Sequence, residues 1–190
     1  MKYDIILAGV GGQGVLSVSA IIASGALEQG LVVKQSEVHG MSQRGGAVLA
    51  HLRLSDEPVA SDLIPHGAAS LILGMEPLES LRYLPYLSPD GAVVTAVTPV
   101  LNIPDYPPIE SLLGRIQALP HARLVDGETL ARTAGSARAI NMVMVGAASH
   151  HVPVPAATLE RFIERTFASK GEKVVAINLA AFRAGREAAL

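Results

Sequence analysis

Three glycines near the amino terminus have the spacing of a nucleotide-binding turn. Gly9, Gly11 and Gly14 follow a short apolar run that predicts a buried strand, and a helical pattern begins directly after them. In such a turn the first glycine permits a sharp exit from the strand, the second lets a ligand approach bare backbone, and the third allows close helix packing. Free N–H groups at the start of the helix favour an anion. The whole turn, with Gly12 and Gln13, is therefore a candidate phosphate-binding site.

Two other interpretations of this turn remain open on these residues. In classical dehydrogenases an acid at the end of the second strand binds ribose, and Glu37 lies at about the required distance, which makes an independent NAD(P)-binding dehydrogenase one alternative. The glycines can also form a compact corner without any ligand, in a Rossmann-like binding or scaffold module. Simple NAD binding is disfavoured because an uncommon polar loop, residues 39–46, follows Glu37 in place of an ordinary third strand, and no substrate domain is evident.

This second loop carries further candidate side chains. A guanidinium at Arg44, between polar residues and two glycines, can bind a phosphate or carboxylate bidentately. The alternative is that Arg44 holds the loop to an acidic neighbour such as Glu37 or to a backbone carbonyl. His39 is a weak candidate for a catalytic proton donor, because a histidine in a glycine-rich loop more often forms a structural hydrogen bond. The candidate ligand-binding residues of the loop are Ser42, Gln43, Arg44, Gly45 and Gly46.

Composition excludes several other kinds of chemistry. The 190 residues contain no cysteine, which removes disulfides, thiolate catalysis and the usual iron–sulfur ligation. Four of the six histidines are widely separated, and the adjacent His150 and His151 would point to different helix faces, so no metal site is expected. A net charge of -2 with 17% charged residues offers no field for nucleic acid. No apolar stretch is long enough to span a bilayer, and we expect a cytoplasmic protein. A mean hydropathy of +0.37 suggests that another chain covers some apolar surface.

The elements that position the two loops are predicted by the alternation of short β-branched runs with helical patterns. Such alternation is typical of βαβ units. The expected strands are 4–10, 31–36, 46–54, 70–74, 91–97 and 123–125, and the expected helices are 15–29, 77–87, 139–150, 155–168 and 173–189. We therefore expect one α/β domain over residues 1–190, Rossmann-like and three-layered, with a mostly parallel sheet and a helical C-terminal third.

Details of the pattern give more specific expectations about single elements. The uniformly apolar run 31–33 suggests a strand covered on both faces, whereas the alternation within 46–54 suggests a strand near an edge with one wetter face. Glu76 and Pro77 should begin a helix, and Asp126 can cap another. The prolines of residues 98–108 predict an extended loop.

Both loops together carry a resemblance to a known family. The glycine turn with residues 36–48, including His39-Gly40-Met41-Ser42-Gln43-Arg44-Gly45-Gly46, resembles the small (beta) subunit of indolepyruvate:ferredoxin oxidoreductase. That subunit is homologous to the gamma subunit or domain of pyruvate and other 2-oxoacid:ferredoxin oxidoreductases. The resemblance continues through residues 141–147 and 178–185.

The resemblance implies that the protein completes an enzyme instead of acting alone. Such enzymes oxidatively decarboxylate a 2-oxoacid to its acyl-CoA and pass the electrons to ferredoxin. Thiamine diphosphate, magnesium and iron–sulfur clusters would belong to a large partner subunit, and this chain would bind no cofactor by itself, apart from a possible contact with CoA. The sequence agrees, because it lacks cysteine and has no Gly-Asp-Gly segment followed by the asparagine of a thiamine diphosphate site.

Overall fold

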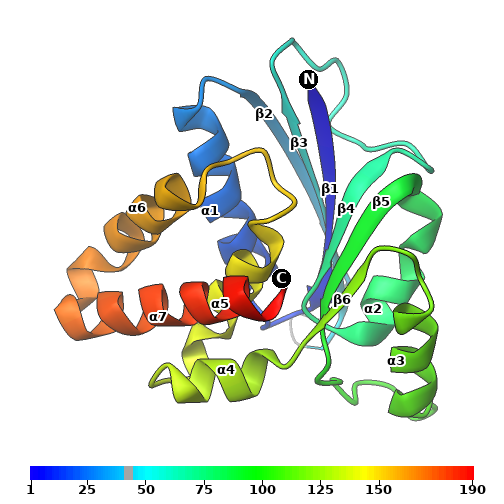
Figure 1. The fold of residues 1–190 in the computed structure, drawn as a ribbon. Coiled ribbons are helices and arrows are strands. Elements are labelled where there is room, and N and C mark those ends of the chain that lie inside the picture. The colour runs from blue at the N-terminus through cyan, green and yellow to red at the C-terminus, as the bar shows by residue number, and fades with distance from the viewer. Residues whose placement is uncertain (41–44) are drawn as a thin grey trace.

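The protein folds around a mixed sheet of six strands, in the spatial order β2-β3-β1-β4-β5-β6 (Figure 1). The computed structural model describes residues 1–40 and 45–190. The strands are β1 (Lys2–Val10), β2 (Val32–His39), β3 (Ala47–Ser55), β4 (Ala69–Gly74), β5 (Leu87–Ala96) and β6 (Ala122–Val125). The helices are α1 (Val15–Glu28), α2 (Pro77–Arg82), α3 (Ile109–Gln117), α4 (Gly127–Thr133), α5 (Ile140–Ala148), α6 (Ala156–Phe167) and α7 (Glu172–Ala188), with short 3₁₀ turns at Leu84–Tyr86, Ala137–Ala139 and Ala168–Lys170.

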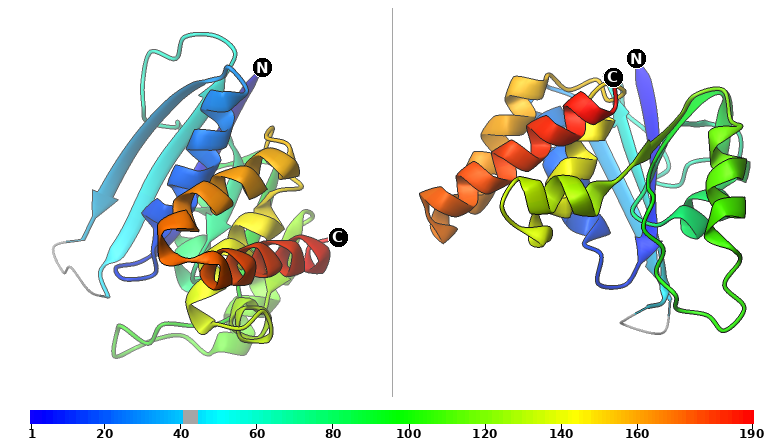
Figure 2. Two further views of the ribbon diagram at one scale, coloured as in Figure 1. Left: turned by 90° about the vertical axis from the view of Figure 1, so that its left-hand side faces the viewer. Right: turned by 60° about the horizontal axis from the view of Figure 1, so that its bottom comes forward.

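Helices cover both faces of this sheet. In Figures 1 and 2, α1 and the C-terminal helices α4 to α7 lie on one face, while α2 and α3 lie on the other. The larger core, which includes Ile22, Leu52 and Phe182, belongs to the first face, and a smaller cluster around Ile72 and Ile116 belongs to the second. The predicted three-layer α/β fold with a helical C-terminal third is therefore confirmed.

Strand directions depart from the expected pattern on one side of the sheet. β1, β4, β5 and β6 are parallel, but β3 runs antiparallel to both β1 and β2. β2 and β3 thus form a hairpin, which places β2 at the edge, where its residues are half-buried or exposed. The prediction that residues 31–33 are covered on both faces is wrong. The antiparallel strand β3 lies beside β1, where a parallel second strand was expected, and β2 is left at the edge of the sheet.

The prediction that residues 46–54 form a strand near an edge is confirmed, since β3 is second from the edge of the sheet, but the predicted wetter face is wrong. β3 lies between β1 and β2, and both His51 and Arg53 are buried. Their polar atoms have partners inside the fold: Arg53 binds Asp4 on β1, and His51 Nδ1 accepts a hydrogen bond of 3.1 Å from the N–H of Ile64. The alternation in the sequence therefore marks internal polar contacts instead of a wet face.

Helix ends follow the local signals, with two exceptions. The carboxylate of Glu76 accepts a hydrogen bond from the N–H of Glu79, with Pro77 in the first turn of α2, and Asp126 caps α4, as predicted. α2 is shorter than the predicted helix 77–87, since it ends at Arg82 and gives way to a 3₁₀ turn around a proline, which cannot donate to a helix. The helix α3 was not predicted.

The side chain of Glu79 gives a pH-dependent prediction. Burial raises the pKa of this carboxyl, the nearby Arg82 lowers it, and Glu76 raises it again. A folded-state pKa above the unfolded value of about 4.3 means that ionisation of Glu79 costs stability as the pH rises above that value. We therefore expect Glu79→Gln to raise the melting temperature at pH 7, with the difference from wild type shrinking as the pH falls toward 4. A variant equally stabilised at both pH values would contradict this expectation.

Candidate functional site

The glycine turn lies at the point where the connections of the sheet change sides. The turn leaves the carboxyl end of β1 toward α1 on one face, whereas β4, its parallel neighbour, leads to α2 on the other face (Figure 1). In open α/β sheets, ligands bind in the crevice outside the carboxyl ends of strands at such a switch point. The predicted site residues of the turn are therefore in the position where this fold class usually binds ligands.

Packing explains two of the three spaced glycines. A Cβ at Gly9 would lie 2.9 Å from the side-chain atoms of both Gln13 and Val15, which is closer than real Cβ contacts allow. Gly14 precedes α1 with a φ of 76°, and a Cβ there would lie 2.3 Å from Asn141 Nδ2. Gly12 has a φ of 100° but faces open space. Packing thus requires glycine at positions 9 and 14, whereas the backbone at Gly12 remains accessible on the outer side of the turn.

Gln13 bridges the two strands that flank the switch point. Its Oε1 accepts a hydrogen bond of 2.9 Å from the N–H of Val10, at the end of β1. Its Nε2 donates one of 2.9 Å to the carbonyl of Met75, directly after β4. The amide of Gln13 therefore ties these strand ends together, and much of its hydrogen-bonding capacity is used inside the protein instead of on a ligand.

The two loops singled out in the sequence meet in the structure. The N–H of Gly11 donates to the carbonyl of Gly46 at 2.8 Å, and the N–H of Gly45 donates to the carbonyl of Gly11 at 3.3 Å. This pairing joins the glycine turn to the start of β3. The candidates Ser42, Gln43 and Arg44 lie outside the described residues.

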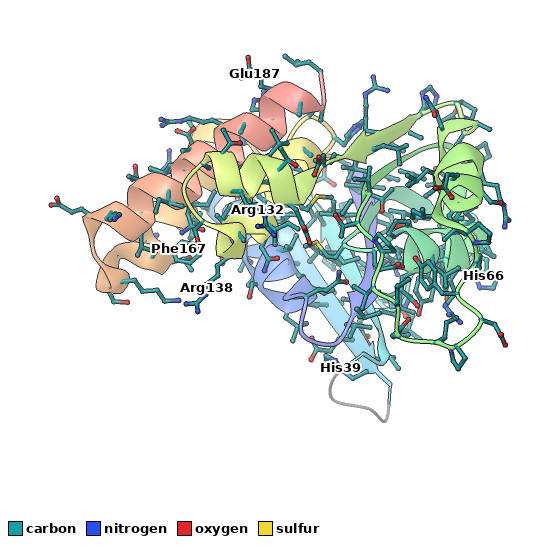
Figure 3. The ribbon with its side chains drawn as sticks, turned by 90° about the horizontal axis from the view of Figure 1, so that it is seen from below. His39, His66, Arg132, Arg138, Phe167 and Glu187 are labelled. Carbon is teal, nitrogen blue, oxygen red and sulfur yellow. The ribbon has the colours of Figure 1, made fainter. Side chains whose placement is uncertain are left out.

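A hollow of about 360 Å³ opens beside the turn. His39, at the end of β2, contributes to its wall, and its Nε2 lies 3.0 Å from Glu37 Oε1. Figure 3, which looks at the sheet from below, has His39 at the same end of the molecule as the start of α1. The hollow is lined by Val10, Gly11, Gly12, Gly14, Val15, Leu16, Ser17, His39 and Val48. His39 is thus brought to the glycine turn, as a candidate proton donor has to be.

The electrostatics of this hollow favour an anion. No side chain caps α1, and its first turn contains no acidic residue. The first N–H groups of a helix have no partner within the helix, and they carry the positive end of its dipole. The part of the chain that the structure describes contains no group of three or more potential metal-ligating side chains. The uncapped start of α1 therefore favours an anionic ligand in the hollow.

Glu37 does not occupy the position of a ribose-binding acid. β3 separates β2 from β1, and adjacent strands lie about 4.8 Å apart, so Glu37 is displaced by roughly 10 Å from the strand that ends in the glycine turn. In the dinucleotide-binding arrangement the acid-bearing strand is the direct neighbour of β1. Together with its contact to His39, this displacement removes the structural basis for the NAD(P) interpretation.

The proline-rich loop contributes contacts that the sequence did not indicate. Asn102 Nδ2 donates to the carbonyl of Gly45 at 2.6 Å. The buried carboxylate of Glu76 accepts hydrogen bonds from the hydroxyl of Tyr106 and, at 3.3 Å, from the N–H of Val100. The prolines predicted an extended segment, but no sequence signal showed that it reaches across the carboxyl end of the sheet and holds the second loop.

The family model for pyruvate ferredoxin/flavodoxin oxidoreductase matches residues 4–188. The chain belongs to this family. The chain is 36% identical over 196 residues to the indolepyruvate oxidoreductase subunit IorB of Methanothermobacter thermautotrophicus. The alignment covers 100% of this chain and 98% of that protein. The family and the enzyme class predicted from the two loops are confirmed, and the dehydrogenase alternative finds no support.

Solved structures of this oxidoreductase family share the fold. The pyruvate oxidoreductase subunit PORC of Thermotoga maritima superposes with a TM-score of 0.77 at 24% identity, covering 98% of this chain and 96% of that one. The 2-oxoglutarate:ferredoxin oxidoreductase of Magnetococcus marinus, solved with 2-oxoglutarate, coenzyme A and succinyl-CoA, gives a TM-score of 0.78 at 24% identity. That match covers 99% of this chain but only 31% of the Magnetococcus chain. In the present chain, none of the helices that the structure describes is long and apolar enough to cross a membrane.

Proposed function

We propose that this protein is the small, cofactor-free subunit of an indolepyruvate:ferredoxin oxidoreductase. The observation that carries the proposal is the 36% identity with an IorB subunit over essentially the whole of both chains. The reaction converts a 2-oxoacid, CoA and two oxidised ferredoxins into acyl-CoA, CO₂, a proton and two reduced ferredoxins. Indolepyruvate or another aryl pyruvate is the proposed substrate.

The proposed complex divides the chemistry between two chains. A large partner subunit would hold thiamine diphosphate with magnesium and the iron–sulfur clusters. These groups would supply the decarboxylation and the electron transfer. This division is supported by the absence of cysteine from the chain, because thiolates are the usual ligands of such clusters. Ferredoxin would meet the complex through the cluster-bearing subunit, and the cytoplasm is the proposed location.

CoA is the proposed ligand of the hollow at the glycine turn. The uncapped start of α1 offers N–H groups to an anion, and bare backbone at Gly12 allows close approach. A phosphate of CoA has the charge that this arrangement favours. The residues proposed to form the site are Gly9, Gly11, Gly12, Gln13, Gly14, Ser42, Gln43, Arg44, Gly45 and Gly46, with Gln13 acting chiefly as a brace.

Reconstitution tests the proposed function. The chain and the large, thiamine-motif subunit would be produced separately and together, and the reduction of ferredoxin would be followed with indolepyruvate and CoA. We expect turnover only from the two subunits combined, and only with both substrates present. Oxidation of indolepyruvate by the small chain alone would exclude the proposal, as would a combined enzyme that turns over only non-aromatic 2-oxoacids.

A charge placed in the hollow tests the CoA site. Ser17 is exposed, lines the hollow and lies in the first turn of α1, where a carboxylate stabilises a helix but repels a phosphate. We expect Ser17→Glu to raise the KM for CoA about tenfold, which corresponds to roughly 1.4 kcal/mol. The KM for the 2-oxoacid should stay unchanged.

The matched control for this experiment is Ser17→Gln, which adds similar bulk without charge. Its KM for CoA should remain close to the wild-type value. If both variants raise the KM for CoA equally, bulk and not charge is responsible. If neither variant changes it, CoA does not bind in the hollow.

A further inference from the structure

A second pocket lies among the C-terminal helices, apart from the hollow at the glycine turn. It has a volume of about 300 Å³ and opens between the start of α5, the end of α6 and the first turns of α7, and we term it the helical pocket. In Figure 3, Arg138 and Phe167, which both line this pocket, lie on the helical side of the molecule, well apart from His39. The apolar part of its wall is formed by Ala139, Phe167, Val174 and Ile177.

The exposed part of this wall is basic. Arg138, directly before the start of α5, and Lys170, at the end of the 3₁₀ turn after α6, are exposed residues that line the pocket. Lys170 Nζ lies 5.3 Å from the centre of the Phe167 ring, a cation–π contact that keeps the ammonium beside the aromatic wall. Within residues 1–40 and 45–190, no carboxylate lines the pocket or forms an ion pair with either cation. Both cations are therefore available to an anion that enters the pocket.

Asn178 adds a hydrogen-bond acceptor to the pocket. The residue is only 6% exposed, and its Nδ2 donates a hydrogen bond of 2.8 Å to the carbonyl of Val174, one turn earlier in α7. Its Oδ1 accepts no hydrogen bond from the described part of the chain, and it is not one of the polar atoms that the protein encloses. The small surface that Asn178 retains therefore faces the pocket, where an N–H or O–H group of a ligand can donate to Oδ1.

These features restrict the class of ligand. A guanidinium binds a carboxylate bidentately, and an adjacent ammonium strengthens the attraction. The apolar wall suits an aromatic body, and a volume of about 300 Å³ is at the lower end of the range for small-molecule sites, which suits one ring system with a short side chain. A planar ring that carries an N–H group at one end and a carboxylate at the other satisfies the cations, the apolar wall and the amide together.

We propose that the helical pocket binds a small aryl carboxylate, with the carboxylate at Arg138 and Lys170, the ring against the apolar wall, and a ring N–H donating to Asn178. Binding of this kind does not depend on the function proposed above. An aryl pyruvate, the proposed substrate, belongs to the same chemical class, and only this connection rests on the proposed function. The pocket is distinct from the hollow assigned to CoA, because the two share no lining residue.

Indole-3-acetate is the probe for this site, because it combines a carboxylate with a ring N–H. The chain contains no tryptophan, so indole fluorescence excited beyond the tyrosine absorption band comes from the probe alone. Its anisotropy would be followed as the full-length chain is added, without any other subunit. We expect saturable binding with a dissociation constant on the order of 0.1–1 mM, the range for a ligand of this size. Indole-3-acetamide, which has nearly the same shape without the charge, should bind about tenfold more weakly.

Three variants place the probe in the pocket, after thermal unfolding has shown that each is folded. The double change Arg138→Gln with Lys170→Gln should weaken binding of indole-3-acetate by about tenfold or more, because hydrogen bonds to charged groups commonly contribute that much. Asn178→Leu keeps the volume but removes the acceptor, and should weaken binding about fivefold. The matched control is Arg132→Gln, since Arg132 is 70% exposed on the neighbouring helix α4 and pairs with Glu128. It should leave binding within about twofold of wild type, as expected for an exposed charge.

Several results would overturn the inference. Equal binding of the acetamide would exclude recognition of the carboxylate, and undiminished binding by the double variant would place the probe elsewhere on the chain. Displacement of indole-3-acetate by inorganic phosphate as effectively as by phenylacetate would identify a general anion site without preference for an aryl body. Absence of saturable binding by the wild-type chain would also overturn the inference, but it would leave the proposed function standing, because no turnover and no other subunit are involved. Failure of the reconstituted enzyme with probe binding intact would remove the proposed function alone.

Discussion

Gly146→Ala is expected to lower the free energy of unfolding by about 3 kcal/mol, and the melting temperature by about 10 °C. Gly146 lies in α5 where α7 crosses it, and a Cβ there would be 1.9 Å from the carbonyl oxygen of Phe182. This neighbour is backbone and cannot rotate away, so the two helices have to separate. Differential scanning calorimetry of the isolated chain measures the effect.

The control for this substitution is Gly114→Ala. Gly114 also lies inside a helix, α3, but a Cβ there meets nothing within 4 Å. Since glycine costs a helix interior about 1 kcal/mol relative to alanine, the control should become slightly more stable. Equal destabilisation by both changes would show that the contact between α5 and α7 does not govern the result, because helix propensity by itself stabilises both variants.

The second helix offers a reciprocal test. Gly185 in α7 would place its Cβ 2.0 Å from the carbonyl oxygen of Val143 in α5. Gly185→Ala should therefore destabilise the protein to a similar extent as Gly146→Ala. Because either change forces the same two helices apart, the double variant should lose less than the sum of the single losses.

Arg53→Met is expected to reduce the free energy of unfolding by about 3–5 kcal/mol, because it leaves the buried carboxylate of Asp4 with only the half-exposed Lys2 ammonium, at 3.4 Å, as an ion-pair partner. Arg53 Nε and Nη2 donate to the carboxylate of Asp4 at 2.9 and 3.1 Å, and both side chains are almost completely buried. Its Nη1 also donates to the carbonyls of Ser61 and Leu63, which holds the loop after β3 against the sheet. Urea denaturation at pH 7 provides the measurement.

An exposed ion pair with similar geometry serves as the comparison. Arg183 donates to Glu160 at 2.8 and 3.1 Å, but its side chain is 63% exposed. Removal of such a surface pair costs about 0–1 kcal/mol, so Arg183→Met should have little effect. Adding Asp4→Asn to Arg53→Met should restore part of the lost stability, since the buried charge is then removed. An unchanged loss in this double variant would assign the effect to the loop contacts alone.

The sequence by itself determined those features that depend on neighbours along the chain. The run from strand through glycine turn to helix, the caps at Glu76 and Asp126, and the extended proline-rich loop all follow from local conformational preferences and hydrogen bonds within a few residues. The motif in residues 39–46 and the glycine turn together were also sufficient to predict the family, because each motif consists of residues that are consecutive in the sequence.

Only the tertiary structure decided which of these segments meet. The insertion of β3 between β1 and β2 moved Glu37 away from the ribose position and converted the alternation around Arg53 into a buried ion pair. Long-range contacts likewise gave Gln13 its bridging role and brought Asn102 to the second loop. Side-chain periodicity reports that a strand has two different faces, but strand order and direction depend on pairings between residues far apart, which no local pattern encodes.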